Sequence, residues 1–345
     1  MRICHINLAK SYRGGERQTE LLIRELAGRG VTQRLLMRRG SVLKNQCSGI
    51  PDLELVEVGN NPIAAALAAR GADVVQVHEA RSVYSAWFAS LLFGIPYVIT
   101  RRVTNPQRHS WVRDRAYRNA GSLVAISRAV AASMRPSYED LDFDIVPDAH
   151  AALGTNPDAV KALKARYPGK VVIGHVGALD HSHKGQRTII EAAQSVRDTH
   201  PDWHFLLVGS GPDEAEFRAA IGDLDNIELT GFVENIGDIY AILDVFVFPS
   251  LKEAIGSAML DAMHFGLPIV ASGVEGIPEF VEDGVNGRLI QPERPEQLVA
   301  AIEEVIRRSQ WTADVRAANR EKAVTLNAAK MADRYESIYA RLMSH

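Results

Sequence analysis

The sequence alternates short runs of β-branched and aliphatic residues with longer helix-like runs, and this alternation restricts the fold more than any other feature. In the first half, the predicted strands are 2–8, 72–77, 97–100, 122–126 and 144–146, and the predicted helices are 16–27, 82–93 and 128–134. Parallel strands need long crossover connections, which are usually helices. The order therefore predicts an α/β protein with a parallel sheet covered by helices.

A second series begins after a linker-like segment at 148–169, in which Gly and Pro residues bracket a predicted charged helix. Its predicted strands are 171–176, 204–208, 226–230, 245–248, 268–271 and 287–290, and its predicted helices are 186–200, 212–224, 235–243, 257–265, 295–308 and a terminal segment from about 313. Two series in 345 residues predict two Rossmann-like domains, 1–148 and 149–326, whose parallel sheets face each other across a cleft. Ligands of such sheets bind at the carboxyl ends of the strands.

Composition is that of a globular protein, with 46% hydrophobic and 23% charged residues. The uncharged stretch 82–100 approaches membrane-spanning length. However, Gly94-Ile95-Pro96 divides it, so we expect a helix, a turn and a strand instead of a membrane span. The N-terminus has no signal-peptide pattern, and two cysteines, Cys4 and Cys47, fit a reducing compartment. We therefore expect a cytoplasmic protein.

Charge is distributed unevenly along the chain. Residues 1–150 carry 20 Lys and Arg against 14 Asp and Glu, whereas the remainder carries 19 against 28. A basic half favours an anionic partner such as a phosphorylated substrate or a membrane surface. The arginine-rich segment 101–118 includes two aromatic residues but no nucleic-acid-binding motif, so we do not expect a nucleic acid partner. The alternative is a solvated surface.

Two short motifs follow predicted strands. Gly14-Gly15 lies between the first strand and the first helix, where backbone amides can approach an anion closely, although a plain tight turn is the alternative. Lys184, in the segment HSHKGQ, is expected at a helix N-terminus, where a cation is unfavourable unless it meets an anion. His181 and His183 have no suitably spaced partner for a metal, so no metal site is expected.

The segment 249–290 carries the strongest signal. A predicted strand ends at Pro249-Ser250, the following loop holds Glu253, and Gly256-Ser257 opens a helix. Asp261 lies one helical turn after Ser257. Carboxylates beside helix N-terminal amides that can hold a diphosphate are suited to accept hydrogen bonds from sugar and ribose hydroxyls.

This segment resembles the signature of the retaining family-4 glycosyltransferases, which have the GT-B fold. In that signature two Glu residues bracket seven residues, and a Gly-Leu-Pro strand and a Gly-Ile-Pro-Glu turn follow. Here the bracketing residues are Glu253 and Asp261, and the strand and turn are 266–272 and 276–279. The likeness extends over most of the chain, through Gly14-Gly15, VVQVHEA, HVGALDHSHKG, LLVGSGPDE and LTGFV.

The resemblance implies three catalytic roles. Glu253 would bind the hydroxyls of a donor sugar, Lys184 would neutralise the leaving diphosphate, and His78 would contact the sugar from the opposite domain. The reaction would be transfer from a nucleotide-diphosphate sugar, UDP- or GDP-linked, with retention by front-face attack. Lys184 and a helix N-terminus would supply the positive charge, so neither a cofactor nor a metal is expected.

Further residues are implied to bind the donor. Backbone amides would hold the diphosphate, Asp261 would bind the ribose, and an apolar pair would lie along the base. These donor-binding residues are Gly14, Gly15, Phe232, Val233, Gly256, Ser257 and Asp261.

The chain departs from the family pattern at two positions. Asp261 is one methylene shorter than the usual Glu, and Ala178 stands where an arginine is common, six residues before the lysine. Arg13, His181 or His183 could replace that arginine. These departures leave a non-catalytic nucleotide-sugar-binding protein as an alternative, whereas the 249–290 signature disfavours a nucleotide-sugar epimerase.

The acceptor is expected to bind the basic N-terminal domain. The ITRRV segment, with Arg101 and Arg102, resembles enzymes of bacterial cell-surface polysaccharide synthesis. The resemblance implies a lipopolysaccharide core, lipid-linked or other glycan acceptor at the cytoplasmic face of the inner membrane. A C-terminal helix at about 327–345 is expected to pack back on the N-terminal domain.

Overall fold

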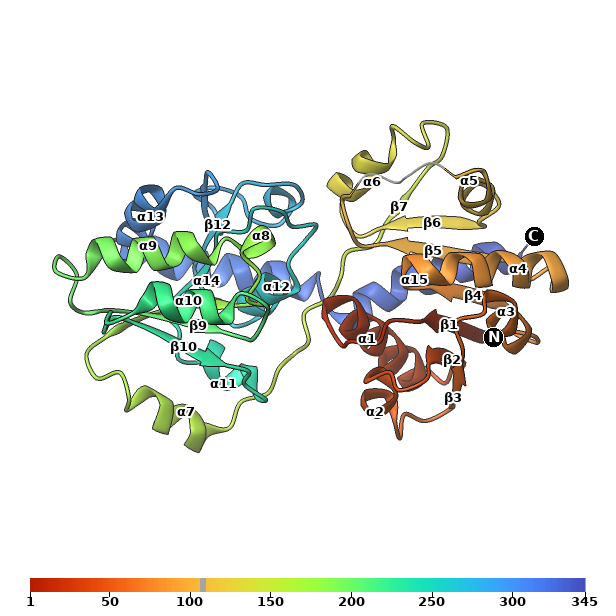
Figure 1. The fold of residues 1–345 in the computed structure, drawn as a ribbon, viewed down its shortest axis with the longest axis horizontal. Helices are drawn as coiled ribbons and strands as arrows, with labels where there is room; N and C mark the ends of the chain where they lie inside the picture. The colour runs from red at the N-terminus through yellow and green to blue at the C-terminus, as the bar shows by residue number, and fades with distance from the viewer. Residues whose placement is uncertain (106–109, 345) are drawn as a thin grey trace. The chain divides into compact units, whose positions relative to one another are not determined.

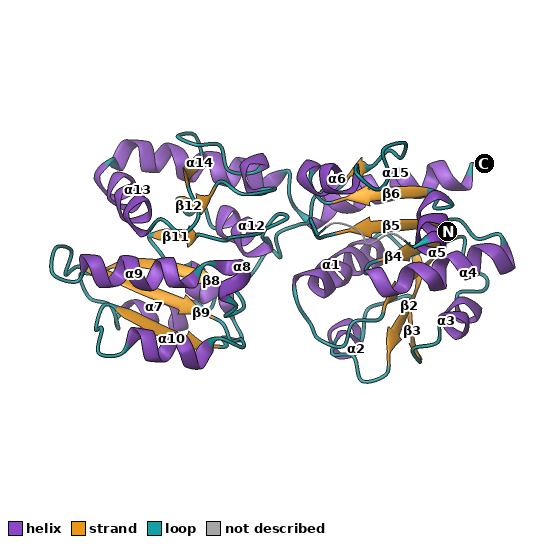
Figure 2. Cartoon of the chain, turned by 45° about the horizontal axis from the view of Figure 1, so that its top comes forward, coloured by secondary structure: helices purple, strands orange, loops and turns teal. Residues whose placement is uncertain are grey.

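The computed structural model describes residues 1–105 and 110–344, which divide into two compact units. Unit 1 comprises Met1–Ala149 and Asn327–His345, and unit 2 comprises His150–Leu326. Each unit is a parallel sheet with helices on both faces (Figure 1, Figure 2). The chain therefore has the predicted α/β architecture.

Unit 1 contains a seven-stranded sheet in the order β3-β2-β1-β4-β5-β6-β7. Its strands are β1 (Arg2–Asn7), β2 (Thr32–Arg38), β3 (Leu53–Val58), β4 (Val74–Val77), β5 (Tyr97–Arg101), β6 (Ser122–Ala125) and β7 (Asp144–Ile145). The helices between them are α1 (Gly14–Gly28), α2 (Leu43–Cys47), α3 (Pro62–Ala68), η1 (Ala80–Ser82), α4 (Val83–Phe93), α5 (Trp111–Arg118) and α6 (Arg128–Met134). The strand order reverses between β1 and β4, and such a reversal is where open α/β sheets bind ligands.

The last helix of the chain, α15 (Ala328–Met343), belongs to unit 1. Its buried residues, among them Met331, Tyr335 and Tyr339, form one core cluster with residues of α1 and of β1, β4, β5 and β6. The alternate residues of these strands face the other core, with α3 and α4. This period of two explains why the strands read as almost continuous apolar runs, because both faces are covered.

Unit 2 contains a six-stranded sheet in the order β10-β9-β8-β11-β12-β13. Its strands are β8 (Val171–Val176), β9 (Trp203–Val208), β10 (Ile227–Gly231), β11 (Val245–Phe248), β12 (Ile269–Ser272) and β13 (Gly287–Ile290). Its helices are α7 (Pro157–Lys164), α8 (His181–Lys184), α9 (Gln186–Val196), α10 (Glu214–Ile221), α11 (Ile236–Tyr240), α12 (Ser257–His264), η2 (Ile277–Glu279), α13 (Pro295–Arg307) and α14 (Ser309–Val324). The order reverses between β8 and β11.

Several elements differ from the sequence-based prediction. The prediction omitted β2, β3, α2, α3 and α5, so the first sheet has two more strands than expected. The uncharged stretch 82–100 forms α4, a turn with Gly94 in the left-handed region, and β5, as predicted. In the part of the chain that the structure describes, no helix is long and apolar enough to cross a membrane.

Candidate active site

In unit 2 the loops that follow β8 and β11 meet where the strand order reverses. Gly185 joins α8 to α9 with φ +65°, and a Cβ there would lie 2.0 Å from the Pro249 carbonyl oxygen. The Leu251 amide donates to the His183 carbonyl oxygen at 2.8 Å. Only glycine fits this close approach, and it brings the loop that carries Lys184 against the loop that carries Glu253.

Lys184 and Glu253 form an ion pair between these two loops. The Lys184 ammonium donates to Glu253 Oε2, and the side chains are 23% and 14% exposed. The ammonium also lies 5.3 Å from the centre of the Phe248 ring. The structure thus brings together the two unit-2 residues that the sequence predicts to be catalytic. Lys184 is the last residue of α8 and lies two residues before the first residue of α9, close to the predicted position.

A buried histidine that the sequence analysis missed lies beneath this pair. His175 donates through Nδ1 to the Val247 carbonyl oxygen at 3.0 Å. Burial and, to a smaller extent, the nearby Lys184 charge lower the His175 pKa to about 4, and the hydrogen bond to Val247 opposes this shift in part. Nε2 has no hydrogen-bond partner among the described residues. A lone histidine inside an apolar strand gave no functional signal in the sequence.

The N-terminus of α12 completes the unit-2 cluster. Gly256 precedes it with φ +85°, and a Cβ there would lie 2.5 Å from the Phe248 ring. Ser257 begins the helix, as predicted. Asp261, which the resemblance implies binds a ribose, is 2% exposed, and its Oδ1 accepts a hydrogen bond from the Ala151 amide at 2.8 Å. The structure therefore places this carboxylate in the interior, on the segment that leaves unit 1.

Phe232 and Val233 follow β10, at the same edge of the sheet. The Gly209 amide donates to the Gly231 carbonyl oxygen at 2.9 Å, which joins the ends of β9 and β10. Phe232 is 79% exposed. An aromatic ring so exposed at the carboxyl edge of the sheet is available to a planar ligand group.

In unit 1 the glycine loop and His78 lie where the strand order reverses between β1 and β4. Gly14 and Gly15 are the first residues of α1, and His78 follows β4 directly. The His78 side chain is 3% exposed, and its Nε2 lies 3.0 Å from Nδ1 of His5. His5 and its partner Gln33 are functional candidates that the sequence analysis missed, because their pairing depends on the register of β1 and β2.

Arg101 and Arg102 differ in what their guanidinium groups contact. Arg101 donates to the carbonyl oxygens of Val103, at 3.1 Å, and Asn105, so it holds the backbone that follows β5. The expectation that Arg101 binds an acceptor stays a prediction. Arg102 pairs with Asp148 at 3.2 Å, and its Cδ would lie 3.8 Å from a Cβ on Gly15. Nη2 of Arg102 is buried and has no hydrogen-bond partner in the described ranges.

The position lacking an arginine, Ala178, is exposed. Of the suggested substitutes, His183 pairs with Asp180 at 3.2 Å, and His181 donates its backbone amide to Asp213 at 2.7 Å. Arg13 is exposed, and its amide donates to Glu16 at 3.0 Å. Within the described residues, no group of three or more His, Cys, Asp or Glu side chains is placed to hold a metal ion.

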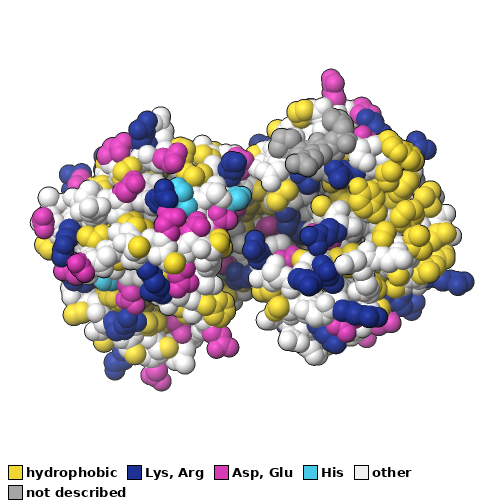
Figure 3. All heavy atoms as spheres, viewed as in Figure 1, with side chains coloured by type: hydrophobic (Ala, Val, Ile, Leu, Met, Phe, Trp, Pro, Cys, Tyr) yellow, Lys and Arg dark blue, Asp and Glu magenta, His cyan; other side chains and the backbone are white. Residues whose placement is uncertain are grey.

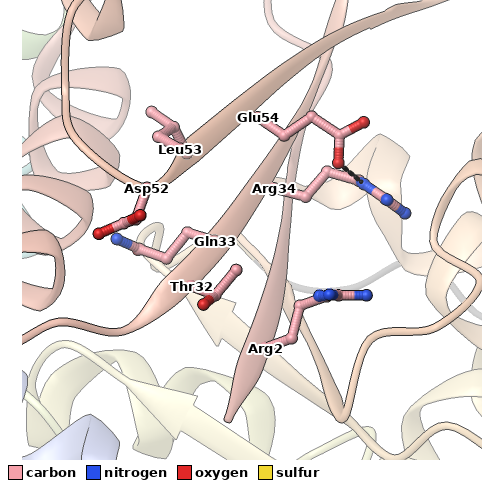
Figure 4. A pocket seen from close by; sticks show the side chains of 7 residues that line it. All are labelled: Arg2, Thr32, Gln33, Arg34, Asp52, Leu53 and Glu54. Carbon is pink, nitrogen blue, oxygen red and sulfur yellow. Dashed lines mark hydrogen bonds and ion pairs between the residues drawn. The ribbon is translucent and has the colours of Figure 1, made fainter.

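A pocket in unit 1 lies at the opposite, amino-terminal edge of the sheet (Figure 4). It is lined by Arg2, Thr32, Gln33, Arg34, Asp52, Leu53 and Glu54. Arg34 pairs with Glu54 at 2.7 Å inside it. Because ligands of these sheets bind at the carboxyl edge, we do not assign this pocket to the site.

Comparison with known proteins places the chain in a family. Residues 170–308 match the family model described as "Glycosyl transferases group 1". The 2-deoxystreptamine glucosyltransferase of Streptomyces kanamyceticus is 30% identical over 266 residues, which cover 68% of each chain. Anabaena Alr3699/HepE in complex with UDP-glucose has the same fold, with a TM-score of 0.85 at 20% identity over 100% of both chains. The lipopolysaccharide outer core galactosyltransferase WaaB has a TM-score of 0.73 at 14% identity, over 99% of both chains.

The strand-end ion pair, the glycine-led helix N-termini and the sequence relationship agree. The non-catalytic and epimerase alternatives are not supported, because the family and the relatives reported above are transferases. The chain therefore belongs to the group 1, or family-4, glycosyltransferases with the GT-B fold, and it is a retaining enzyme that uses a nucleotide sugar.

Proposed function

We propose that this enzyme transfers a hexose from a UDP-sugar without a metal ion. The observation that carries the proposal is the Lys184–Glu253 pair at the strand-order reversal of unit 2. Lys184 supplies positive charge for the diphosphate that leaves, and Glu253 accepts hydrogen bonds from hydroxyls of the sugar. The fold shared with Alr3699/HepE, whose structure contains UDP-glucose, supports uridine as the base.

The remaining unit-2 groups are assigned to the nucleotide. The amides of Gly256 and Ser257 at the start of α12 donate to the diphosphate, and Phe232 with Val233 contacts the base. Asp261 is assigned to the Ala151 backbone and not to the ribose, because its carboxylate is almost fully buried. Attack of the acceptor on the same face from which the diphosphate leaves gives retention.

Unit 1 carries its own set of groups suited to an anionic ligand. Gly14 and Gly15 open α1, and the stem of Arg102 passes beside Gly15. The unpaired Nη2 of Arg102 is a donor without an acceptor, and a buried guanidinium nitrogen of this kind is satisfied by a phosphate oxygen. We therefore propose that Arg102 binds an anionic oxygen of the ligand.

Thermal unfolding with nucleotides tests the donor assignment. UDP, GDP, ADP and CMP are compared, each with Mg²⁺ and with EDTA. A ligand at 100 times its Kd adds about 2.7 kcal/mol to the free energy of unfolding. We expect UDP to stabilise the protein equally in Mg²⁺ and in EDTA. Stabilisation by another nucleotide only, or only with Mg²⁺, would contradict the donor or the metal-free assignment respectively.

We further propose that the acceptor is a glycan or glycolipid met at an anionic membrane surface. Hydrophobic side chains gather over α4 and its neighbours in unit 1 (Figure 3). The exposed members of this apolar patch are Ile63, Leu67, Leu91, Leu92 and Trp111. These side chains lie on α3, α4 and α5, and α4 packs against the other two helices. Patches of this kind mark protein or membrane contacts.

Basic residues beside the apolar patch favour the membrane. The Arg70 guanidinium lies 5.8 Å from the centre of the Phe93 ring, and α5 carries the exposed Arg115 and Arg118. Apolar side chains bordered by arginine are typical of proteins that bind the interface of anionic bilayers. This arrangement supports peripheral binding at the cytoplasmic face of the inner membrane.

Sedimentation with vesicles tests the membrane proposal. We expect the wild type to bind phosphatidylglycerol vesicles more tightly than phosphatidylcholine vesicles. The double variant Leu91→Ser, Leu92→Ser loses roughly 2 kcal/mol or more of apolar burial and is expected to bind at least about tenfold more weakly. Val285→Ser removes an exposed apolar side chain of unit 2 and serves as the control. Equal binding of the two variants would refute the proposal.

A further inference from the structure

A chain of hydrogen bonds runs through the interior of unit 1 and ends at His78. Gln33 Nε2 donates to the Ile23 carbonyl oxygen at 3.0 Å. Gln33 Oε1 lies 2.9 Å from Nε2 of His5, and His5 Nδ1 lies 3.0 Å from Nε2 of His78. The three side chains of Gln33, His5 and His78 are all buried, so water does not compete for these contacts.

Gln33 determines which ring nitrogen of His5 and of His78 carries the proton. Because Gln33 uses its NH₂ group on Ile23, its Oε1 accepts a hydrogen bond, and His5 must donate from Nε2. Burial lowers the pKa of His5 to about 4, so the ring is neutral near pH 7 and its Nδ1 is an acceptor. His78 then donates from Nε2, and its own Nδ1 is left with a lone pair.

Nδ1 of His78 is therefore an acceptor that lacks a donor. It is buried, and none of the residues described donates to it, which is costly for a polar atom in the interior. Arg102 Nη1 donates to the His78 carbonyl oxygen at 3.1 Å. Burial, His5 and the Arg102 charge together lower the pKa of His78, so the ring remains neutral and does not gain a second proton.

We infer that Gln33 and His5 are positioning residues that hold His78 protonated on Nε2, so that Nδ1 accepts a hydrogen bond from a hydroxyl group of the donor sugar. A hydroxyl can donate to a bare nitrogen, whereas an ionised phosphate cannot. Arg102 and His78 thus bind different groups of the ligand. The guanidinium binds an anionic oxygen, and the imidazole binds a hydroxyl. The identity of the ligand rests on the proposed function, but the proton positions do not.

The proton positions are tested first, on the ligand-free protein. Nitrogen-15 NMR of histidine-labelled protein distinguishes a protonated from a bare ring nitrogen, and the His78→Gln variant identifies the His78 signals. We expect His78 to be protonated on Nε2 and bare on Nδ1 at pH 7. Protonation on Nδ1, or an imidazolium, would overturn the inference whether or not the protein binds a nucleotide.

The variant Gln33→Glu tests which group donates and which accepts in each hydrogen bond of the series. A carboxylate beside His5 favours the His5 imidazolium, which donates from Nδ1 to His78 and moves the His78 proton to its own Nδ1. Gln46→Glu adds the same charge at an exposed position of unit 1 and is the matched control. His5→Phe, which removes both nitrogens, is the second variant should Gln33→Glu fail to fold, and it is expected to release the single His78 tautomer.

Calorimetric titration then separates sugar from nucleotide. UDP alone and UDP-glucose are compared on the wild type, Gln33→Glu and Gln46→Glu. We expect Gln33→Glu to bind UDP within twofold of the wild type and UDP-glucose at least tenfold more weakly, with Gln46→Glu unchanged. Equal losses for both ligands would overturn the assignment of Nδ1 to the sugar. Failure of the wild type to bind either ligand would refute the UDP-sugar proposal, while the NMR result would still decide the proton positions.

Discussion

At the scale of single residues, the Lys184–Glu253 pair leads to a specific prediction for kcat. An ammonium that stabilises charge developing on a leaving group contributes about 3 to 4 kcal/mol, or 10²- to 10³-fold in kcat. We therefore expect Lys184→Ala to lower kcat with a UDP-sugar by this factor. The measurement is the steady-state release of UDP.

Lys252 provides the control for this variant. It is exposed and lies next to Glu253 in the chain, so Lys252→Ala removes the same charge without touching the pair. Its kcat should remain within twofold of the wild type. Because Lys184→Ala also strips Glu253 of its ion-pair partner, thermal unfolding of both variants must show that the protein remains folded. Similar kcat values for the two variants would sink the assignment of Lys184.

The sequence indicated some candidate site residues and not others for a physical reason. Glu253, Lys184 and Gly256 lie in loops whose local pattern is itself the signal, because strand ends and helix starts are set by neighbouring residues. His5, Gln33 and His175 lie inside strands, and their roles depend on which side chain another strand places opposite. The hydrogen bond that Asp261 accepts from the Ala151 amide could not be predicted either, because that amide lies 110 residues away in the sequence.

At the scale of elements, Gly185 joins the two loops of the unit-2 site. A side chain at position 185 would be destabilised both by the positive φ and by the close Pro249 carbonyl oxygen. Gly169 has a similar φ of +69°, but a Cβ there would have no atom within 4 Å. Gly169→Ala should lower the free energy of unfolding by about 1 to 2 kcal/mol. Gly185→Ala should cost about 3 kcal/mol or more and abolish UDP binding, because the loops must separate.

Urea unfolding and UDP titration of the two alanine variants check this expectation. Both substitutions lie in unit 2 and both introduce the same methyl group, so their difference isolates the contact with Pro249. If Gly185→Ala were no more destabilising than Gly169→Ala, the loops would not depend on this turn.

The pattern of charged residues in β2 and β3 explains why these strands were not predicted. β2 and β3 carry charged residues among apolar ones, and this weakened their strand signal. In the sheet, Arg34 and Glu54 are register partners and pair at 2.7 Å, so each charge is offset by the neighbouring strand. A cross-strand pair of this kind is not visible in either segment alone, although the near-alternation of LELVEV in β3 is a usable signal.

At the scale of the whole molecule, each unit contains a buried neutral histidine, His5 in unit 1 and His175 in unit 2. Burial lowers both pKa values to about 4, against about 6.5 in the unfolded chain. Below pH 6.5 the unfolded state therefore binds protons that the folded state does not. The contribution of each histidine to the free energy of unfolding, roughly 3 kcal/mol, is complete above pH 6.5 and is lost as the pH falls to about 4.

Because the two histidines lie in different units, acid should destabilise each unit separately. A variant that removes one histidine should reduce the acid sensitivity only of the unit that contains it. His175→Asn retains an N–H donor for the Val247 carbonyl oxygen but does not titrate. Hydrogen exchange at pH 7 and pH 4.5 should then show a smaller loss of protection in β8 and β11 than in the wild type, with β1 and β4 unchanged. His183→Asn, at a half-exposed position, should leave the wild-type loss intact. An equal loss in β8 and β11 for the wild type and His175→Asn would mean that other groups cause the acid sensitivity of unit 2.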